Sequence, residues 1–175
     1  MKKEVRQFLK SDQRCLVLER DPGLGVVSHW RRVRCPLKPP LNFIVIQLAK
    51  VCPSQRLIRF LFRTVLGMRI GRNVTFSPMN PDPLLPELIE IGDNSALGWK
   101  VNIMCHYFTQ ARQKFGRVSI GKNVLIGGFS TIAPGVSIGD NSAVAMNSAV
   151  KENVPANELW GGNPARFIRK LDGLL

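Results

Sequence analysis

The stretch VSIGKNVLIGGFSTIAPGVSIGDNSAVAMNSAVKENVP, residues 118–155, carries an aliphatic residue at every sixth position. The same spacing occurs upstream between Ile91 and Ile103. A Gly or Ala follows most of these aliphatic residues, and a fixed repeat of this kind indicates a repetitive architecture. The aliphatic positions are Ile91, Leu97, Ile103, Ile120, Ile126, Ile132, Ile138, Val144 and Val150. The positions four residues later are mostly small or β-branched: Ser95, Val101, Tyr107, Val124, Ser130, Val136, Ser142, Ser148 and Val154.

This spacing excludes a helix, because six residues at about 100° each would scatter the aliphatic side chains around the helix axis. A long strand would be broken by the Gly, Asn and Asp residues that return in each repeat. A very short strand followed by a turn remains, with the aliphatic residue and the small residue two positions before it both pointing inward. Three such sides close a coil, and stacked coils bury one continuous apolar column. The pattern therefore predicts an all-β solenoid, a parallel β-helix.

Three segments carry a family resemblance: IGDNSALGWKVNIM from Ile91, IGKNVLIGGFSTIAPGVSIGDNSAVA from Ile120, and VPANELWGGNPARFIRKL from Val154. Together they resemble the hexapeptide-repeat acyltransferases, in particular the galactoside, maltose and polysaccharide O-acetyltransferases. The resemblance covers residues 69–170 and implies a left-handed coil. Local chirality alone would favour a right-handed crossover.

Charge divides the chain into two parts. Residues 1–72 contain sixteen Lys and Arg against four Asp and Glu, whereas residues 73–175 contain nine against eight. We therefore expect a basic, partly helical N-terminal extension over residues 1–68, an acyltransferase β-helix over 69–160 and a C-terminal tail over 161–175. Residues 1–40 have no clear periodicity and are expected to be irregular.

The four cysteines show no CxxC spacing, and the N-terminus lacks the apolar segment of a signal peptide. Both features favour reduced thiols in a cytoplasmic protein. The longest apolar run, from Leu41 to Val51, is too short to cross a bilayer.

Two helical segments are predicted at 41–51 and 55–66, separated by Pro53. In the second, Arg56, Arg59 and Arg63 share one helical face. A basic amphipathic helix can lie on an anionic membrane at the cytoplasmic face, or it can pack on the end of the solenoid or on a neighbouring subunit. No recognised motif supports nucleic-acid binding.

The regular repeat is interrupted twice, by the Pro-rich residues 77–87 and by a predicted loop insertion at 109–117. His106 stands just before the second interruption, where Met104 replaces the expected Gly or Ala. From the residues alone, His106 could be structural or catalytic. The family resemblance implies that it is the general base, which would take a proton from an acceptor hydroxyl. Cys105 suggests a rival Cys–His pair, but adjacent strand residues point to opposite faces.

The resemblance also implies a carboxylate that orients the imidazole, for which Asp82 and Glu87 are the candidates, with Glu87 preferred. Gly128 is the expected oxyanion donor through its backbone N–H. Acetyl-CoA is the implied acyl donor, and no metal is expected. Small residues at the coil edges would line the pantetheine arm of acetyl-CoA, although Met146 departs from the small-residue pattern. Arg166 and Lys151 would bind phosphate, and Trp160 would either contact the adenine or cap the end of the solenoid. The expected coenzyme A residues are Gly127, Gly128, Ala133, Ala145, Met146, Lys151, Trp160 and Arg166.

The sequence thus predicts a homotrimeric, acetyl-CoA-dependent O-acetyltransferase acting on a sugar or glycan hydroxyl, with a lipid-linked glycan as one candidate acceptor. The alternatives are N-acetylation of an amino sugar and a non-catalytic, membrane-docked trimeric scaffold. A zinc lyase with this fold would need three converging histidines. The chain offers only His106 in its repeats and His29 in the extension.

Overall fold

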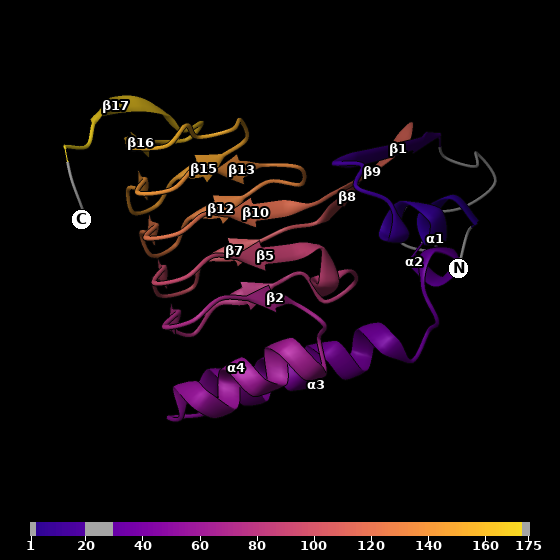
Figure 1. Ribbon diagram of the computed structural model, residues 1–175. Helices are drawn as coiled ribbons and strands as arrows, with labels where there is room; N and C mark the ends of the chain where they lie inside the picture. Colours follow the sequence, from indigo (N-terminus) through magenta and orange to yellow (C-terminus); the bar gives the residue numbers. More distant parts are fainter. Residues whose placement is uncertain (1–2, 20–29, 173–175) are drawn as a thin grey trace.

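The computed structural model describes residues 3–19 and 30–172 and shows a column of stacked coils (Figure 1). Each coil contributes one short strand to each of three parallel sheets, and eighteen residues separate paired positions such as Ile120 and Ile138. The predicted parallel β-helix is confirmed. The first sheet contains β2 (Arg69–Ile70), β5 (Ile89–Ile91), β10 (Val118–Ile120) and β13 (Ser137–Ile138). The second contains β3 (Thr75–Phe76), β6 (Ala96–Leu97), β11 (Leu125–Ile126), β14 (Ala143–Val144), β16 (Glu158–Gly161) and, antiparallel to β16, β17 (Arg166–Lys170). The third contains β4 (Asn80–Pro81), β7 (Asn102–Ile103), β12 (Thr131–Ile132) and β15 (Ala149–Val150).

The inside of the column is filled as the repeat predicts. All nine aliphatic positions from Ile91 to Val150 are buried, and so are eight of the nine positions four residues later. Tyr107 is the exception and is exposed. It differs because β8 (His106–Phe108) leaves the column and joins an antiparallel arm instead of starting the next side.

One corner of the column carries a ladder of asparagine side chains, which we call the asparagine ladder. Each member has a positive φ, between 53° and 61°, a conformation that Asn tolerates better than most residues. The side-chain amide of each of the first four members donates a hydrogen bond to the side-chain oxygen of the next member, one coil further on, at donor–acceptor distances of 3.3, 3.2, 2.9 and 3.1 Å along the chain. The ladder therefore fixes both the turn and the stacking of the coils. Its members are Asn73, Asn94, Asn123, Asn141 and Asn157.

Two helices close the N-terminal end of the column, α3 (Lys38–Val51) and α4 (Gln55–Thr64), as the two predicted helical segments require. The Ser54 hydroxyl caps α4 by accepting a hydrogen bond from the Leu57 N–H at 3.4 Å. In Figure 1 both helices lie across the end of the column beneath β2. Their buried side chains, which include Ile46 and Phe62, belong to the same core as the coils.

The prediction that residues 1–40 are irregular is wrong. They include α1 (Lys3–Lys10), β1 (Cys15–Glu19) and α2 (Trp30–Val33). The predicted loop at 109–117 is likewise mostly strand, because β9 (Arg112–Gly116) pairs antiparallel with both β1 and β8. These three strands form an arm beside the column (Figure 1). The cause is pairing between segments almost a hundred residues apart, which local patterns do not reveal.

Arg117 fastens α1 to the base of this arm. Its guanidinium donates hydrogen bonds to the carbonyls of Phe8, Leu9, Ser11 and Gln13, at distances from 2.7 to 3.2 Å. The last carbonyls of a helix carry partial negative charge and lack hydrogen-bond donors within the helix. A guanidinium supplies both positive charge and donors at this end. At the opposite end of the chain, the expected boundary at residue 160 falls inside β16, which pairs with β17.

We predict that replacing Asn123 by Ala lowers the free energy of unfolding by about 2 kcal/mol, because two inter-coil hydrogen bonds are lost and the positive φ becomes unfavourable. Asn123→Gly loses the same hydrogen bonds but tolerates the φ, so it should be less destabilised by about 1 kcal/mol. Urea unfolding at one fixed protein concentration measures both variants. Equal losses for Ala and Gly would contradict the role of the backbone conformation.

Candidate active site

The candidate site begins with an imidazole and a carboxylate at one edge of the third sheet. Asp82 directly follows β4, and His106 lies three residues beyond the end of β7. Since Pro81 pairs with Ile103, both residues emerge at the same corner, one coil apart. The His106 Nδ1 and Asp82 Oδ2 atoms are 2.6 Å apart. The imidazole is half-buried, whereas the Asp82 side chain is almost completely buried.

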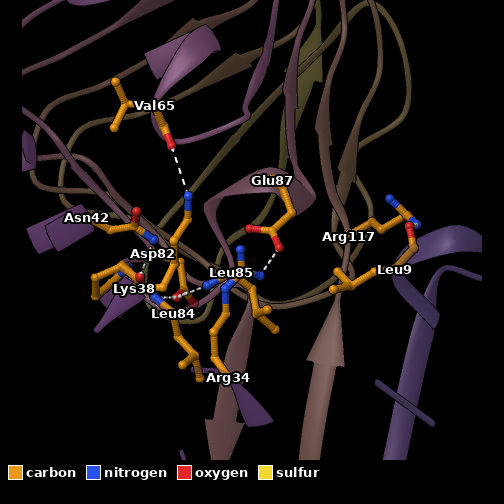
Figure 2. Close-up of polar contacts among 11 residues, drawn as sticks. Leu9, Arg34, Lys38, Asn42, Val65, Asp82, Leu84, Leu85, Glu87 and Arg117 are labelled. Carbon is orange, nitrogen blue, oxygen red and sulfur yellow. Dashed lines mark hydrogen bonds and ion pairs between the residues drawn. The ribbon is translucent and has the colours of Figure 1, made fainter. Parts of the chain in front are cut away.

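Backbone amides hold the Asp82 carboxylate from both sides. Oδ1 accepts hydrogen bonds from the N–H groups of Leu84 and Leu85 at 2.8 and 3.2 Å (Figure 2). Oδ2 accepts from the N–H groups of Cys105 and His106 at 2.7 and 3.1 Å. Burial by itself would raise the pKa of Asp82, but the hydrogen bond and charge of the imidazole, with the amides of Cys105 and Leu85, outweigh it and lower this pKa.

An ionised Asp82 fixes the tautomer of His106. A carboxylate accepts hydrogen bonds only, so Nδ1 must carry the proton and donate it to Oδ2. The other ring nitrogen, Nε2, is then left with its lone pair in the neutral imidazole. This arrangement produces an oriented general base.

The preference for Glu87 as the orienting carboxylate is wrong. Glu87 lies in the 3₁₀ turn η2 (Pro86–Leu88) and forms an ion pair with Arg34 (Figure 2). This ion pair connects the segment between α2 and α3 to the Pro-rich residues 77–87, which interrupt the coils. The carboxylate that meets the imidazole is Asp82, the second of the two candidates.

Cys105 is unsuited to act as a nucleophile. Its side chain is completely buried beneath the site. Burial, and then the negative charges of Asp82 and Glu87, raise the pKa of the Cys105 thiol well above its ordinary value. The sulfur therefore stays protonated at neutral pH, and a protonated thiol is a poor nucleophile.

The predicted coenzyme A residues divide between two edges of the column. Ala133 directly follows β12 and Lys151 directly follows β15, at the same edge as His106. Arg166, at the start of β17, joins this edge through a 2.7 Å ion pair with Glu152. The remaining corner residues follow β11 and β14 in the second sheet and lie at a different edge: Gly127, Gly128, Ala145 and Met146.

These two edges are far apart within one chain. Gly128 and Ala133 are separated by five residues along one side of a coil, roughly 16 Å of extended chain. An oxyanion donor must lie about 3 Å from the developing charge. The Gly128 N–H and the His106 imidazole of a single chain therefore cannot serve one reacting carbonyl. Trp160 lies in β16, where its indole N–H donates to the Glu158 carboxylate at 2.7 Å.

The stacking of the coils requires glycine at position 127. A Cβ added there would lie 2.5 Å from the backbone nitrogen of Met146 in the next coil. Coil stacking alone excludes a side chain at this position. Its small size consequently carries little information about coenzyme A.

The arm supplies features that sequence reasoning missed. The Phe108 ring lies 5.0 Å from the imidazole of His106 and 6.0 Å from the ring of buried Phe115, measured between ring centroids. The exposed ring of Tyr107 lies 5.9 Å from the Lys114 ammonium. The segment RQKFG, residues 112–116, does not alternate polar and apolar residues, so no local signal marked a strand here.

Within residues 3–19 and 30–172, no group of three or more His, Cys, Asp and Glu side chains is arranged to hold a metal ion. His29, the second histidine considered for a zinc site, lies outside the described residues.

Known proteins resemble this chain in sequence and in structure. The family described as "Hexapeptide repeat of succinyl-transferase" matches residues 117–152. "Putative acetyltransferase YvoF" of Bacillus subtilis (strain 168) is 38% identical over 153 residues, covering 86% of this chain and 89% of that protein. A maltose O-acetyltransferase from Clostridium difficile 630 is 25% identical with a TM-score of 0.59, covering 78% of this chain and 87% of that chain. A galactoside acetyltransferase in complex with coenzyme A shares the fold, with 21% identity, a TM-score of 0.60 and coverage of 86% and 92%.

The hexad repeat, the three-sided column and these matches define a left-handed β-helix protein. The left hand implied by the family resemblance is thus confirmed, against the expectation from local chirality. The chain belongs to the hexapeptide-repeat acyltransferase family.

We predict that Asp82→Asn lowers the free energy of unfolding at pH 7 by about 1.5–3 kcal/mol, because the amides and the imidazole lose an ionised acceptor. The lowered pKa of Asp82 means that its ionised form stabilises the fold above the unfolded-state pKa of about 3.9. This stabilisation is lost as the pH falls through the still lower folded-state pKa. The difference between wild type and variant should therefore shrink below about pH 4. Urea unfolding from pH 7 to pH 3 measures it, and a difference independent of pH would contradict the assignment.

Proposed function

We propose that this protein is an acetyl-CoA-dependent O-acetyltransferase that modifies a hydroxyl group of a sugar or glycan. The observation that carries the proposal is the imidazole of His106, which is held by a buried and ionised Asp82 and keeps 22% of its side-chain surface exposed. The resemblance to a maltose O-acetyltransferase at 25% identity supports a sugar acceptor. The fold is shared with a galactoside acetyltransferase that binds coenzyme A.

His106 would act as base and then as acid. Nε2 takes the proton of the acceptor hydroxyl as its oxygen attacks the acetyl carbonyl, and the imidazolium later gives that proton to the departing thiolate. Acetyl-CoA, when bound, supplies an already activated thioester, so no covalent intermediate on the protein is required. Asp82 stabilises the imidazolium between the two proton transfers. A positioned base of this kind typically contributes about 10²–10⁴-fold to the rate.

The edge beside His106 offers residues that suit coenzyme A. Ala133 leaves room along the edge, and Lys151 and Arg166 supply positive charge for phosphate. Arg166 is paired with Glu152, but the two side chains are 60% and 59% exposed. An ion pair so exposed is worth only about 0–1 kcal/mol. A phosphate group could therefore replace Glu152 as the partner of Arg166 at little cost.

A second chain would complete the site. Gly128 and Met146 lie at the edge that is remote from His106 of the same chain. A homotrimer with parallel columns can place this edge of one subunit opposite the imidazole edge of its neighbour. The remote edge also exposes large apolar side chains, Trp99, Phe129 and Met146, which favours burial against another subunit. We therefore propose that the active enzyme is a trimer with its sites between subunits.

The arm is the best candidate for selecting the acceptor. β8 carries His106 into the arm, and Tyr107 follows it with an exposed ring. An aromatic face next to the base could pack against the apolar face of a sugar ring. Amino sugars belong in the same acceptor panel, because acetylation of nitrogen is the alternative reaction.

We predict that His106→Ala lowers kcat/KM for acetyl transfer by about 10²–10⁴-fold, because the proposed base is removed. Release of the coenzyme A thiol in the presence of maltose, galactosides and amino sugars measures the activity. The variant's thermal unfolding and sedimentation mass serve as controls for folding and assembly. Unchanged turnover by a correctly assembled variant would exclude His106 as the base.

A further inference from the structure

The base of the column presents an apolar surface that nothing in the described chain covers. From the N-cap residue Leu37 through α3, apolar residues recur with spacings of four, three, four and three, so they lie along one side of the helix. Their exposed fractions run from 49% to 81%. Two exposed apolar side chains of α4, Leu57 and Phe60, add to them. We call these seven residues the base face: Leu37, Leu41, Ile44, Leu48, Val51, Leu57 and Phe60.

The base face lies on the sides of α3 and α4 that do not pack into the core. The opposite sides of both helices are occupied by the first coil. The Asn42 side-chain amide donates to the Pro83 carbonyl at 2.9 Å, and Gln55 exchanges hydrogen bonds with the backbone of Phe76 at 2.9 and 3.1 Å. In Figure 1 the two helices lie crosswise at the end of the column. Subunits that pack side by side in a trimer would leave this end uncovered.

The charge around the base face is positive. The sequence contains ten Lys and Arg between Asp21 and Asp82 but no Asp or Glu, and three of these cations, Arg34, Arg69 and Arg72, pair with carboxylates from later in the chain. Arg59 and Arg63 of α4 line an open hollow of about 410 Å³ together with Arg72, Asn73, Asp93 and Asn94. Its one carboxylate, that of Asp93, pairs with Arg72. Arg63 donates to the carbonyls of Ile70 and Gly71 and is thereby held at the rim of this hollow.

An apolar surface next to the arginines of α4 favours one kind of binding partner. Two copies of the protein joined end to end would bring two basic surfaces together, which is unfavourable. An anionic bilayer matches both features, since apolar side chains reach the acyl boundary while arginines meet the phosphates. Of the described helices, none combines the length and the apolar character that crossing a bilayer requires.

We propose that the base face docks the protein on an anionic phospholipid surface, as a peripheral contact in the membrane interface. The apolar side chains of α3 and α4 enter the headgroup–acyl boundary, and Arg59 binds lipid phosphates. In the proposed trimer three base faces would share one plane, so three weak contacts would act together.

Sedimentation with vesicles tests the proposal on the full chain, without acetyl-CoA, so the result does not depend on the proposed activity. Wild type should bind vesicles of phosphatidylcholine with 30% phosphatidylglycerol at least tenfold more strongly than phosphatidylcholine alone, and less strongly as salt is raised. Ile44→Asp should weaken binding to the anionic vesicles at least tenfold. Ile168→Asp makes the same change at a residue of similar exposure, 53% against 55%, on β17, and should leave binding unchanged.

A second variant tests the arginines of α4 while leaving the apolar surface intact. Arg59→Ala should weaken binding to anionic vesicles and leave the weak binding to neutral vesicles unchanged. Wild type that stays in solution with anionic vesicles at low salt would overturn the proposal. Equal losses for Ile44→Asp and Ile168→Asp would do the same. A sedimentation mass of two trimers, reduced by Ile44→Asp, would assign the base face to a second copy of the protein instead.

Discussion

The structure depends on three-sided coils that stack in register, and an uninterrupted coil, such as the one from Ile120 to Ile138, is eighteen residues long. Apolar side chains fill the inside and are buried from Ile91 to Val150, but burial alone would not fix how one coil sits on the next. The asparagine ladder and the close backbone contact at the corners supply that constraint. A Cβ on Gly98, for example, would lie 2.6 Å from the backbone nitrogen of Gly128. Such contacts leave little freedom for one coil to rotate on its neighbour.

The candidate site lies where this regularity fails. After β7 the chain leaves the column for the arm, and the residues at the point of departure are Cys105 and His106. Their two N–H groups turn toward the carboxylate of Asp82. The same interruption thus provides the imidazole, two of the carboxylate's four amide partners and the aromatic ring of Phe108. The regular coils below and above hold these groups in place.

Sequence reasoning predicted the features that depend on residue spacing and failed where distant segments meet. The hexads indicated the three-sided column and its buried positions, and only one histidine stood at an interruption. The choice between Asp82 and Glu87 depended on a 3₁₀ turn that carries Glu87 to Arg34, and no local pattern contains Arg34. The arm was missed because β1 and β9 are almost a hundred residues apart. The asparagine ladder was visible as Asn two residues after several Gly corners, but its inter-coil bonds appear only once the coils are stacked.

The coils are also spaced evenly along the axis of the column. Neighbouring strands in a sheet lie about 4.8 Å apart, so the height of a coil residue above the two closing helices is set by counting turns. Asp82 belongs to the first turn and His106 to the second, which puts the imidazole roughly 10 Å above the helical layer. An acceptor anchored at the helical layer would need a spacer of comparable length to reach the imidazole. One additional coil between the layer and His106 would lengthen that spacer by one strand spacing and would leave the reacting groups unchanged.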